Sequence, residues 1–230
     1  FKRKKKFNII NSFFYNLDKF LLFSNSIKLN FYLNLEFIFK RLAHEKSYIK
    51  FQNLHPATQN TINNIKKYVN KNCNILDVGC GNGYIAYSLS KYVKKITCVD
   101  YDLDAINNAQ KKYSKKNIKY ICGNIIDINN LDLKNINLII CSHIIEHIDN
   151  PFSFLKFLKK FDSLIYVEVP DFENDNLNQV KKLLNYSLRF TDEDHIYEFD
   201  RNSILKKLKK MKFKIVDQIY KNGVICLLIK

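Results

Sequence analysis

The chain has 230 residues, 47% of them hydrophobic, which is enough for one domain of ordinary size with an appendage. Its net charge of +16 is uneven, because residues 1–72 hold 14 Lys and Arg against 3 Asp and Glu, whereas residues 73–230 hold 24 against 19. No apolar run approaches the roughly 18 residues of a membrane span, so no transmembrane segment is expected. The basic N-terminal part suggests an anionic partner, such as a phosphorylated substrate, nucleic acid or a membrane surface; a solvated lysine-rich face is the alternative.

The cysteines and the first residues bear on the cellular compartment. The six cysteines form no C-x-x-C pair, which argues against a disulfide or zinc framework and for a reducing environment. The opening run at residues 1–6 lacks the long apolar core and the small-residue cleavage site that are typical of a signal peptide. We therefore expect a cytoplasmic protein.

Residues 1–72 are expected to form a basic, aromatic-rich helical extension or lid. Phe13, Leu17 and Phe20 recur at spacings of three and four, and the same spacing returns between residues 35 and 42. These patterns predict two or three amphipathic helices, and Pro56 predicts the start of another. The helices would pack on the domain that follows or, because basic residues stand beside aromatic ones, would lie on a membrane surface.

A short apolar strand followed by a glycine-rich turn is the feature around which the rest of the chain is organised. Residues 75–78 are typical of a buried strand, and Gly79, Gly81 and Gly83 follow it before a helical pattern begins. Glycines let a backbone pass close to a ligand, and a helix N-terminus presents free N–H groups, so the segment predicts a cofactor cradle. The G-x-x-x-x-G-K-[ST] pattern is absent, which excludes a P-loop.

Strands and helices alternate beyond this cradle. A second strand over residues 96–99 ends at Asp100, where an open α/β sheet places an acid that binds ribose hydroxyls. Further strands are predicted over residues 118–122, 138–141 and 163–170, a helix over 203–210, and a terminal hairpin from the runs 213–216 and 224–229. This alternation predicts an α/β fold with a doubly wound, mainly parallel sheet.

The letters ILDVGCGNG at residues 75–83 and VDYD at 99–102 resemble motif I and the next strand of class I S-adenosylmethionine (SAM) methyltransferases. The resemblance covers roughly residues 72–230 and implies a seven-stranded Rossmann-like sheet and a SAM-binding methyltransferase domain at 73–230. It also implies that the glycines admit the methionine end of SAM, that Asp77 orients its amine, and that Asp100 binds its ribose. The other implied cofactor contacts are Cys80, Tyr101, Asn124, Ile125 and Ser142, with Tyr101 and Ile125 on the two sides of the adenine.

The segment Ser142–Pro151 is the second notable feature. His143, Glu146 and His147 are related by i, i+3 and i+4, so they share one face if the segment is helical, and His195 follows in DEDHIYEF. The segment resembles the E-x-x-E-H of ubiquinone-biosynthesis O-methyltransferases and of small-RNA 3′-end 2′-O-methyltransferases, in which a metal is bound. Here His143 stands in place of the first glutamate.

Three interpretations of these residues stay open. In the first, His147 is a general base that takes a proton from a substrate hydroxyl, since a neutral imidazole suits that work near pH 7. In the second, His143, Glu146 and His147, with or without His195, hold a divalent metal that binds the substrate oxygens. In the third, the residues are only packed and hydrogen-bonded.

The letters EVPD at residues 168–171 and DHIYEFDRNSILKKL at 194–208 resemble a broad family that includes methyltransferases of surface-glycan and secondary metabolism. That resemblance implies a variable insertion over roughly residues 172–194. Glu168, Asp171 and His195 are its expected substrate contacts, since loops at strand ends carry specificity. For Glu168 the alternative is a salt-bridged surface loop.

Three functions from different classes are compatible with these features. The leading one is SAM-dependent O-methylation of a small molecule or of a sugar- or phosphate-containing glycan precursor, as in polysaccharide biosynthesis. An RNA methyltransferase is favoured by the basic N-terminal region, although no recognisable RNA-binding module is present. The third is a non-catalytic SAM-binding protein that stabilises a partner enzyme. Neither the acceptor nor the oligomeric state follows from the sequence.

Overall fold

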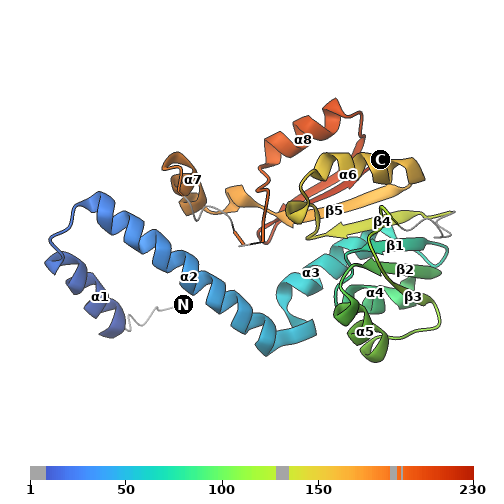
Figure 1. The fold of residues 1–230 in the computed structure, drawn as a ribbon, viewed down its shortest axis with the longest axis horizontal. Helices are drawn as coiled ribbons and strands as arrows, with labels where there is room; N and C mark the ends of the chain where they lie inside the picture. The colour runs from blue at the N-terminus through green and yellow to red at the C-terminus, as the bar shows by residue number, and fades with distance from the viewer. Residues whose placement is uncertain (1–8, 128–134, 187–190, 193) are drawn as a thin grey trace, which may run out of the picture. The chain divides into compact units, whose positions relative to one another are not determined.

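The computed structural model describes residues 9–127, 135–186, 191–192 and 194–230 (Figure 1). The basic run at residues 1–6 lies outside the described residues, and so does part of the insertion expected over 172–194. The chain divides into two compact units, Phe1–His44 and Glu45–Lys230, which are described in turn.

Two helices make up the described part of the N-terminal unit: α1 (Ile9–Phe20) and the larger part of α2 (Asn25–Phe51). Asp18 of α1 accepts a hydrogen bond from the Tyr32 hydroxyl at 2.6 Å and forms an ion pair with Lys28 at 3.5 Å, which ties the two helices together. The predicted amphipathic pattern is confirmed for α1 only, because α2 carries apolar residues all round. Among the described helices, none is both long and apolar enough to cross a membrane.

The larger unit is built on a seven-stranded sheet with the strand order β3-β2-β1-β4-β5-β7-β6. The strands are β1 (Asn74–Val78), β2 (Lys95–Asp100), β3 (Ile118–Cys122), β4 (Leu138–Ser142), β5 (Leu164–Pro170), β6 (Ile215–Lys221) and β7 (Val224–Ile229). The first five strands are parallel, and β7 runs antiparallel to both of its neighbours, β5 and β6. The predicted doubly wound, mainly parallel sheet and the terminal hairpin are therefore confirmed.

Helices cover both faces of this sheet, and each buries one apolar stripe against it. The core of one face contains residues of α3 (Pro56–Ile65), α4 (Tyr84–Leu89) and α5 (Leu103–Lys112), and the core of the other contains residues of α6 (Pro151–Leu158) and α8 (Arg201–Lys210). The connections contain α7 (Asn176–Leu183) and the short 3-10 helices η1 (Gln52–Leu54), η2 (Lys66–Tyr68), η3 (Ser90–Tyr92), η4 (Ile145–His147), η5 (Lys159–Phe161) and η6 (Phe172–Asn174). Asp102, Asn150 and Asp200 cap α5, α6 and α8 by accepting backbone N–H bonds.

The strand order reverses at β1, which lies between β2 and β4. Chain connections leave such a point in opposite directions, so a crevice opens outside the carboxyl ends of the strands. The ends of β1, β2 and β4 carry Gly79, Asp100 and Ser142, respectively. The sheet topology thus brings three of the expected cofactor contacts to one edge.

Helix α3 begins at Pro56, as predicted, and packs on the sheet. Ile62 is 2% exposed and Ile65 is fully buried, in the same core as Ile75 of β1 and Leu138 of β4. The helix therefore belongs to the larger unit, and the division after His44 lies earlier in the chain than the expected boundary after residue 72. The lid role of residues 1–72 stays a prediction.

Replacing Ile65 by alanine tests the packing of α3 on the sheet. The variant Ile65→Ala should lower the free energy of unfolding by about 2–4 kcal/mol, because it removes buried methyl groups and leaves a cavity. Asn63 is exposed on the same helix, so Asn63→Ala should change the stability by less than about 0.5 kcal/mol. Urea denaturation measures both variants, and equal small effects would show that α3 does not share this core.

Candidate cofactor and acceptor site

The glycine-rich turn after β1 is packed on one side and open on the other. Gly79, Gly81 and Gly83 have φ angles of 65°, 49° and 76°, which residues with side chains rarely adopt. A Cβ atom on Gly79 would also collide with the Ile144 side chain, whereas one on Gly81 would meet no atom within 4 Å. A ligand can therefore approach the backbone closely at Gly81.

Asp100, at the end of β2, holds this turn in place. Its Oδ2 accepts a hydrogen bond from the Gly81 N–H at 2.7 Å, and its Oδ1 accepts one from the Asp102 N–H at 3.0 Å. A carboxylate offers about four acceptor positions, so two N–H donors leave room for others. The position and the spare capacity of Asp100 fit a pair of ribose hydroxyls.

Asp77, in the middle of the sheet, is a buried carboxyl group in need of a partner. Its side chain is 3% exposed, and its Oδ2 has no hydrogen-bond partner among the described residues. Burial, and secondly the charge of Asp100, raise the pKa of Asp77 to about 7. A cationic ligand at the turn would stabilise the ionised form, and the ammonium group of an amino acid is such a ligand. The residues at this edge therefore fit both the methionine and the ribose ends of SAM.

The side chains expected around the adenine differ in exposure. Tyr101 is 85% exposed, so its ring is available for stacking, whereas Ile125 is only 5% exposed and packs in the core. Asn124 is exposed, and its Oδ1 accepts a hydrogen bond from the Ile126 N–H at 3.1 Å. Because these residues follow β2 and β3, they lie beside Asp100 at the carboxyl edge of the sheet. Their contact with adenine stays a prediction.

Cys80 and Ser142, the other two expected cofactor contacts, lie in different surroundings from the residues expected around the adenine. Cys80 is buried and, with Asn82 and Tyr48, lines a cleft of about 570 Å³ next to α4 and α5. Ser142 lies at the end of β4, and its hydroxyl donates a hydrogen bond to Glu168 at 3.4 Å. Cys80 therefore borders the outer side of the glycine turn. Ser142 instead belongs to the polar network around Glu168.

The segment after β4 is not α-helical, which corrects the expectation that His143, Glu146 and His147 share one helical face. His143 has a φ of 54°, and only Ile145–His147 form a single 3-10 turn, η4. The His143 N–H donates to the Glu168 carbonyl at 2.8 Å, which holds this sharp turn against β5. His143 and His147 are consequently directed to different partners.

The His143 imidazole bridges two buried carboxyl groups. Its Nδ1 lies 3.3 Å from Glu146 Oε1, and its Nε2 lies 3.4 Å from Glu168 Oε1. Burial opposes a charge on the ring, but the hydrogen bonds to Glu146 and Glu168 outweigh it and raise the pKa of His143 well above its usual range. Burial likewise opposes ionisation of Glu168, yet the bond from His143 and those from Thr61 and Tyr166 lower its pKa. Both groups therefore carry their charges at neutral pH.

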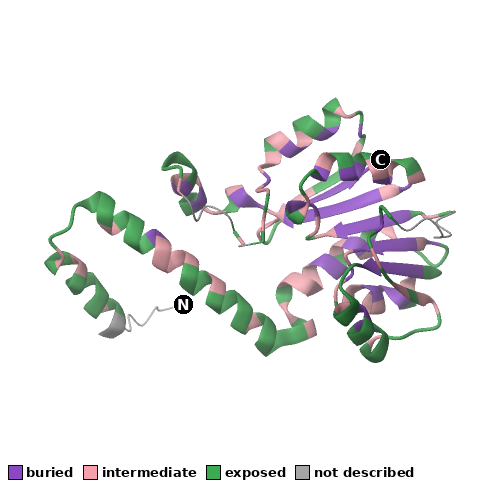
Figure 2. Ribbon diagram, viewed as in Figure 1, coloured by how far each residue is buried: buried purple, intermediate pink, exposed green. Residues whose placement is uncertain are grey.

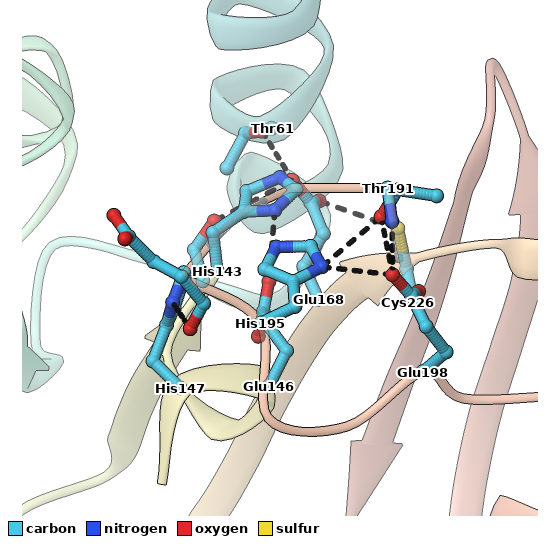
Figure 3. A network of polar contacts seen from close by, with 11 residues as sticks. Thr61, His143, Glu146, His147, Glu168, Thr191, His195, Glu198 and Cys226 are labelled. Atoms are coloured by element: carbon cyan, nitrogen blue, oxygen red, sulfur yellow. Dashed lines mark hydrogen bonds and ion pairs between the residues drawn. The ribbon is translucent and has the colours of Figure 1, made fainter. Parts of the chain in front are cut away.

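Glu168 is held entirely by protein groups, which argues against its expected contact with substrate. It is 1% exposed and accepts hydrogen bonds from the hydroxyls of Thr61 and Tyr166 and from Cys226 Sγ at 3.3 Å (Figure 3). No sequence pattern pointed to Thr61, which lies 107 residues away in the chain. The network thereby connects α3, β5 and β7 to the turn that carries His143.

Asp171, the second expected substrate contact beside Glu168, is also engaged within the protein. Arg201 at the start of α8 donates to its Oδ2 from Nε at 2.9 Å and from Nη2 at 2.5 Å. Asp171 is 5% exposed. This charge-assisted pair fixes the first turn of α8 against the end of β5.

Glu146, His147 and His195 form a compact group of their own. One ligand atom from each lies within 4.8 Å of the other two, and the two imidazole rings are 4.9 Å apart (Figure 3). The Glu146 carbonyl accepts hydrogen bonds from the N–H groups of Ile196 and Tyr197 at 2.9 and 3.1 Å. These bonds hold the segment that carries His195, which is distant in sequence, against η4. His143 is outside this group, because both of its ring nitrogens face carboxylates.

The partners of each imidazole indicate which nitrogen is available. His147 Nδ1 lies 3.0 Å from the Asp194 carbonyl oxygen, and His195 Nδ1 lies 3.1 Å from Glu198 Oε1. These oxygens only accept hydrogen bonds, so they assign the proton to Nδ1 and leave a lone pair on Nε2 of each neutral ring. Glu146 Oε2 is buried and has no hydrogen-bond partner within the described part of the chain. Two imidazole nitrogens and one carboxylate oxygen suit a divalent cation or the acceptance of a proton.

Known methyltransferases resemble this chain. A protein-family model described as a methyltransferase domain matches residues 76–161. The ubiquinone biosynthesis O-methyltransferase of Coxiella burnetii is 32% identical over 88 residues, which cover 37% of this chain and 37% of that protein. The ribosomal RNA small subunit methyltransferase A of Fusobacterium nucleatum is 32% identical over 91 residues, which cover 35% and 34%. The chain thus spans about a third of the length of these relatives.

Among solved structures, the magnesium protoporphyrin IX methyltransferase from Synechocystis with bound SAH is similar to this chain. The match has a TM-score of 0.59 and 15% identity, and it covers 74% of this chain and 82% of that chain. At this identity the likeness shows a common fold.

Replacing Asp77 by asparagine tests how much its buried carboxyl group lowers the free energy of unfolding. Because its pKa rises from 3.8 to about 7 on folding, Asp77 favours the folded state less and less as the pH rises between these values. Ligand-free Asp77→Asn should therefore match the wild type near pH 4 and exceed its free energy of unfolding by about 2–4 kcal/mol at pH 8. The exposed Asp104→Asn is the control, and a stability difference that does not grow with pH would contradict this account.

Proposed function

We propose that this chain binds SAM at residues 77–83 and methylates an acceptor oxygen, since residues 76–161 match a family model described as a methyltransferase domain. The observation that carries the proposal is the buried Asp77 Oδ2, which has no hydrogen-bond partner among the residues that the structure describes, beside an open glycine turn with Asp100 next to it. Bound SAM supplies an electrophilic methyl group on a positively charged sulfur. The residues of this chain then have to align the acceptor with that methyl group and take up its proton.

Each residue of the cofactor site has a proposed role. Asp77 faces the amine of SAM, and Asp100 accepts hydrogen bonds from the ribose hydroxyls. Tyr101 stacks on one side of the adenine, and Asn124 binds its exocyclic amine. The remaining contacts, from backbone or apolar atoms, are Gly79, Cys80, Gly81, Gly83, Ile125 and Ser142.

Calorimetric titration with SAM tests this site. We expect the wild type to bind one SAM molecule with a dissociation constant in the micromolar range. Asp100→Asn should weaken binding by about 10- to 100-fold, because charge-assisted hydrogen bonds to the ribose are lost. Asp104, exposed in the first turn of α5, provides the control Asp104→Asn, which should bind as the wild type does. An unchanged affinity in Asp100→Asn would overturn the assignment of the ribose site.

On the acceptor side, we propose that Glu146, His147 and His195 hold a divalent cation. Three observations support this cation site. One ligand atom from each residue lies within 4.8 Å of the other two, Glu146 Oε2 has no hydrogen-bond partner in the described part of the chain, and the Nδ1 contacts orient both imidazoles. Carboxylates and carbonyls commonly orient metal-binding histidines in this way, so Glu198 and the Asp194 carbonyl would serve as the outer shell. A cation there would lower the pKa of an acceptor hydroxyl. Without a cation, His147 Nε2 is the proposed general base, and the two roles compete for the same atom.

Metal titration separates these two roles. Metal-free protein should bind one Mn²⁺ or Zn²⁺ ion, and His195→Ala should weaken that binding at least about 10-fold while leaving the affinity for SAM unchanged. His44→Ala removes a histidine of the N-terminal unit and should alter neither affinity. Equal metal binding by the wild type and His195→Ala would exclude the cation site. In that case, loss of turnover in His147→Ala with SAM affinity retained would support the general base instead.

For the acceptor, we propose a small molecule or a sugar- or phosphate-containing glycan precursor. The first relative is named for ubiquinone biosynthesis, which supports oxygen as the methylated atom. An RNA acceptor is the second candidate, because another relative is named for ribosomal RNA and residues 1–72 carry most of the net positive charge, +11 of +16. RNA binding that weakens steeply with salt would favour it.

A further inference from the structure

Helix α1 exposes an apolar stripe. Phe13, Leu17 and Phe20 follow one another at helical spacing, with exposed fractions of 61%, 40% and 80%, and Phe14 borders them at 57%. The loop after the helix adds Leu22, which is fully exposed, and Phe23. Six exposed apolar residues between positions 13 and 23 form an unusually apolar surface, which we call the α1 stripe: Phe13, Phe14, Leu17, Phe20, Leu22 and Phe23.

The contact between α1 and α2 leaves this stripe uncovered. The polar part of the contact runs through Asp18, which binds the Tyr32 hydroxyl and the Lys28 ammonium group. Lys28 also donates to the Asp18 carbonyl at 2.6 Å. Figure 2 shows α1 as exposed along most of its length. Polar groups at Asp18 thus link the two helices, and the side chains of the α1 stripe stay exposed.

The charge around the stripe favours one kind of partner. Residues 1–44 contain nine Lys and Arg against two Asp and Glu, and five of the nine are at residues 2–6, directly before α1 in the sequence. Basic clusters next to an amphipathic helix are attracted to anionic lipid headgroups, while the aromatic side chains enter the boundary of the acyl chains. With 12 residues, α1 is about 18 Å long, too short to span a bilayer.

We propose that the α1 stripe binds the surface of an anionic lipid membrane, with α1 lying in the plane of the interface. Its polar side, which includes Asn16 and Lys19, then faces the headgroups and water. The basic residues provide long-range attraction, and the stripe provides apolar burial. This inference is independent of the proposed methyl transfer, and it would bring the larger unit to a membrane surface where lipid-linked or amphipathic acceptors are concentrated.

Vesicle sedimentation of the full chain tests the proposal. The probes are vesicles of phosphatidylcholine alone and of phosphatidylcholine with phosphatidylglycerol at about 7:3. We expect at least about tenfold stronger partitioning onto the anionic vesicles, which weakens as salt is added because the charges are screened. Absence of binding to the anionic vesicles would overturn the proposal.

A matched pair of variants separates the stripe from general charge effects. Phe20→Asp should reduce partitioning at least about tenfold, because it places a charge in the stripe that the bound membrane would bury. Tyr15 is an exposed aromatic residue on the other side of α1, so Tyr15→Asp makes the same charge change and should reduce partitioning less than about threefold. Equal losses in the two variants would contradict the proposal. So would a dimer without vesicle binding that Phe20→Asp dissociates in sedimentation velocity, since the stripe would then bind a second copy.

Discussion

The buried carboxyl group of Asp77 is the constraint on which the rest of the cofactor site depends. A carboxylate in the central strand of a sheet loses its hydration, and here the nearby Asp100 adds a second negative charge. The fold places both groups beside a turn whose backbone only glycine adopts easily, and one of its glycines faces open space. A ligand that carries a cationic amine and vicinal hydroxyls would satisfy both carboxyl groups at once. The destabilising feature of the free protein is thus the recognition feature of the proposed complex.

The proposed acceptor side also depends on a pair of buried carboxyl groups, those of Glu146 and Glu168. His143 supplies a positive charge between Glu146 and Glu168, and Glu168 is further held by Thr61 and Tyr166. One oxygen of Glu146 is engaged by His143, and the other has no hydrogen-bond partner among the described residues. The substitution of histidine for glutamate at the first position of the E-x-x-E-H pattern therefore changes a candidate ligand into a residue that orients its neighbour.

Local patterns in the sequence predicted much of the fold and of the cofactor edge. Short β-branched runs marked the parallel strands, and the glycines and Asp100 followed from their spacing after β1 and β2. The acceptor side was predicted less well, because a left-handed residue at His143 breaks the assumed helix, and a spacing rule does not register such a turn. The family resemblance makes Glu168 and Asp171 expected substrate contacts, and no local pattern registers the partners that hold them in the structure, Thr61 and Arg201, which are distant in sequence. The grouping of His195 with Glu146 depends on the same kind of long-range contact.

The most direct test of the account is the proton balance of SAM binding. At about pH 6.5 the Asp77 carboxyl group, with a pKa of about 7, is largely protonated in the free protein, and the bound ammonium group would ionise it. Calorimetry in two buffers of different ionisation enthalpy counts the protons released. The account predicts release of a substantial fraction of one proton per SAM bound by the wild type, and none by Asp77→Asn. Absence of SAM binding, or binding with the same proton balance in both proteins, would contradict it.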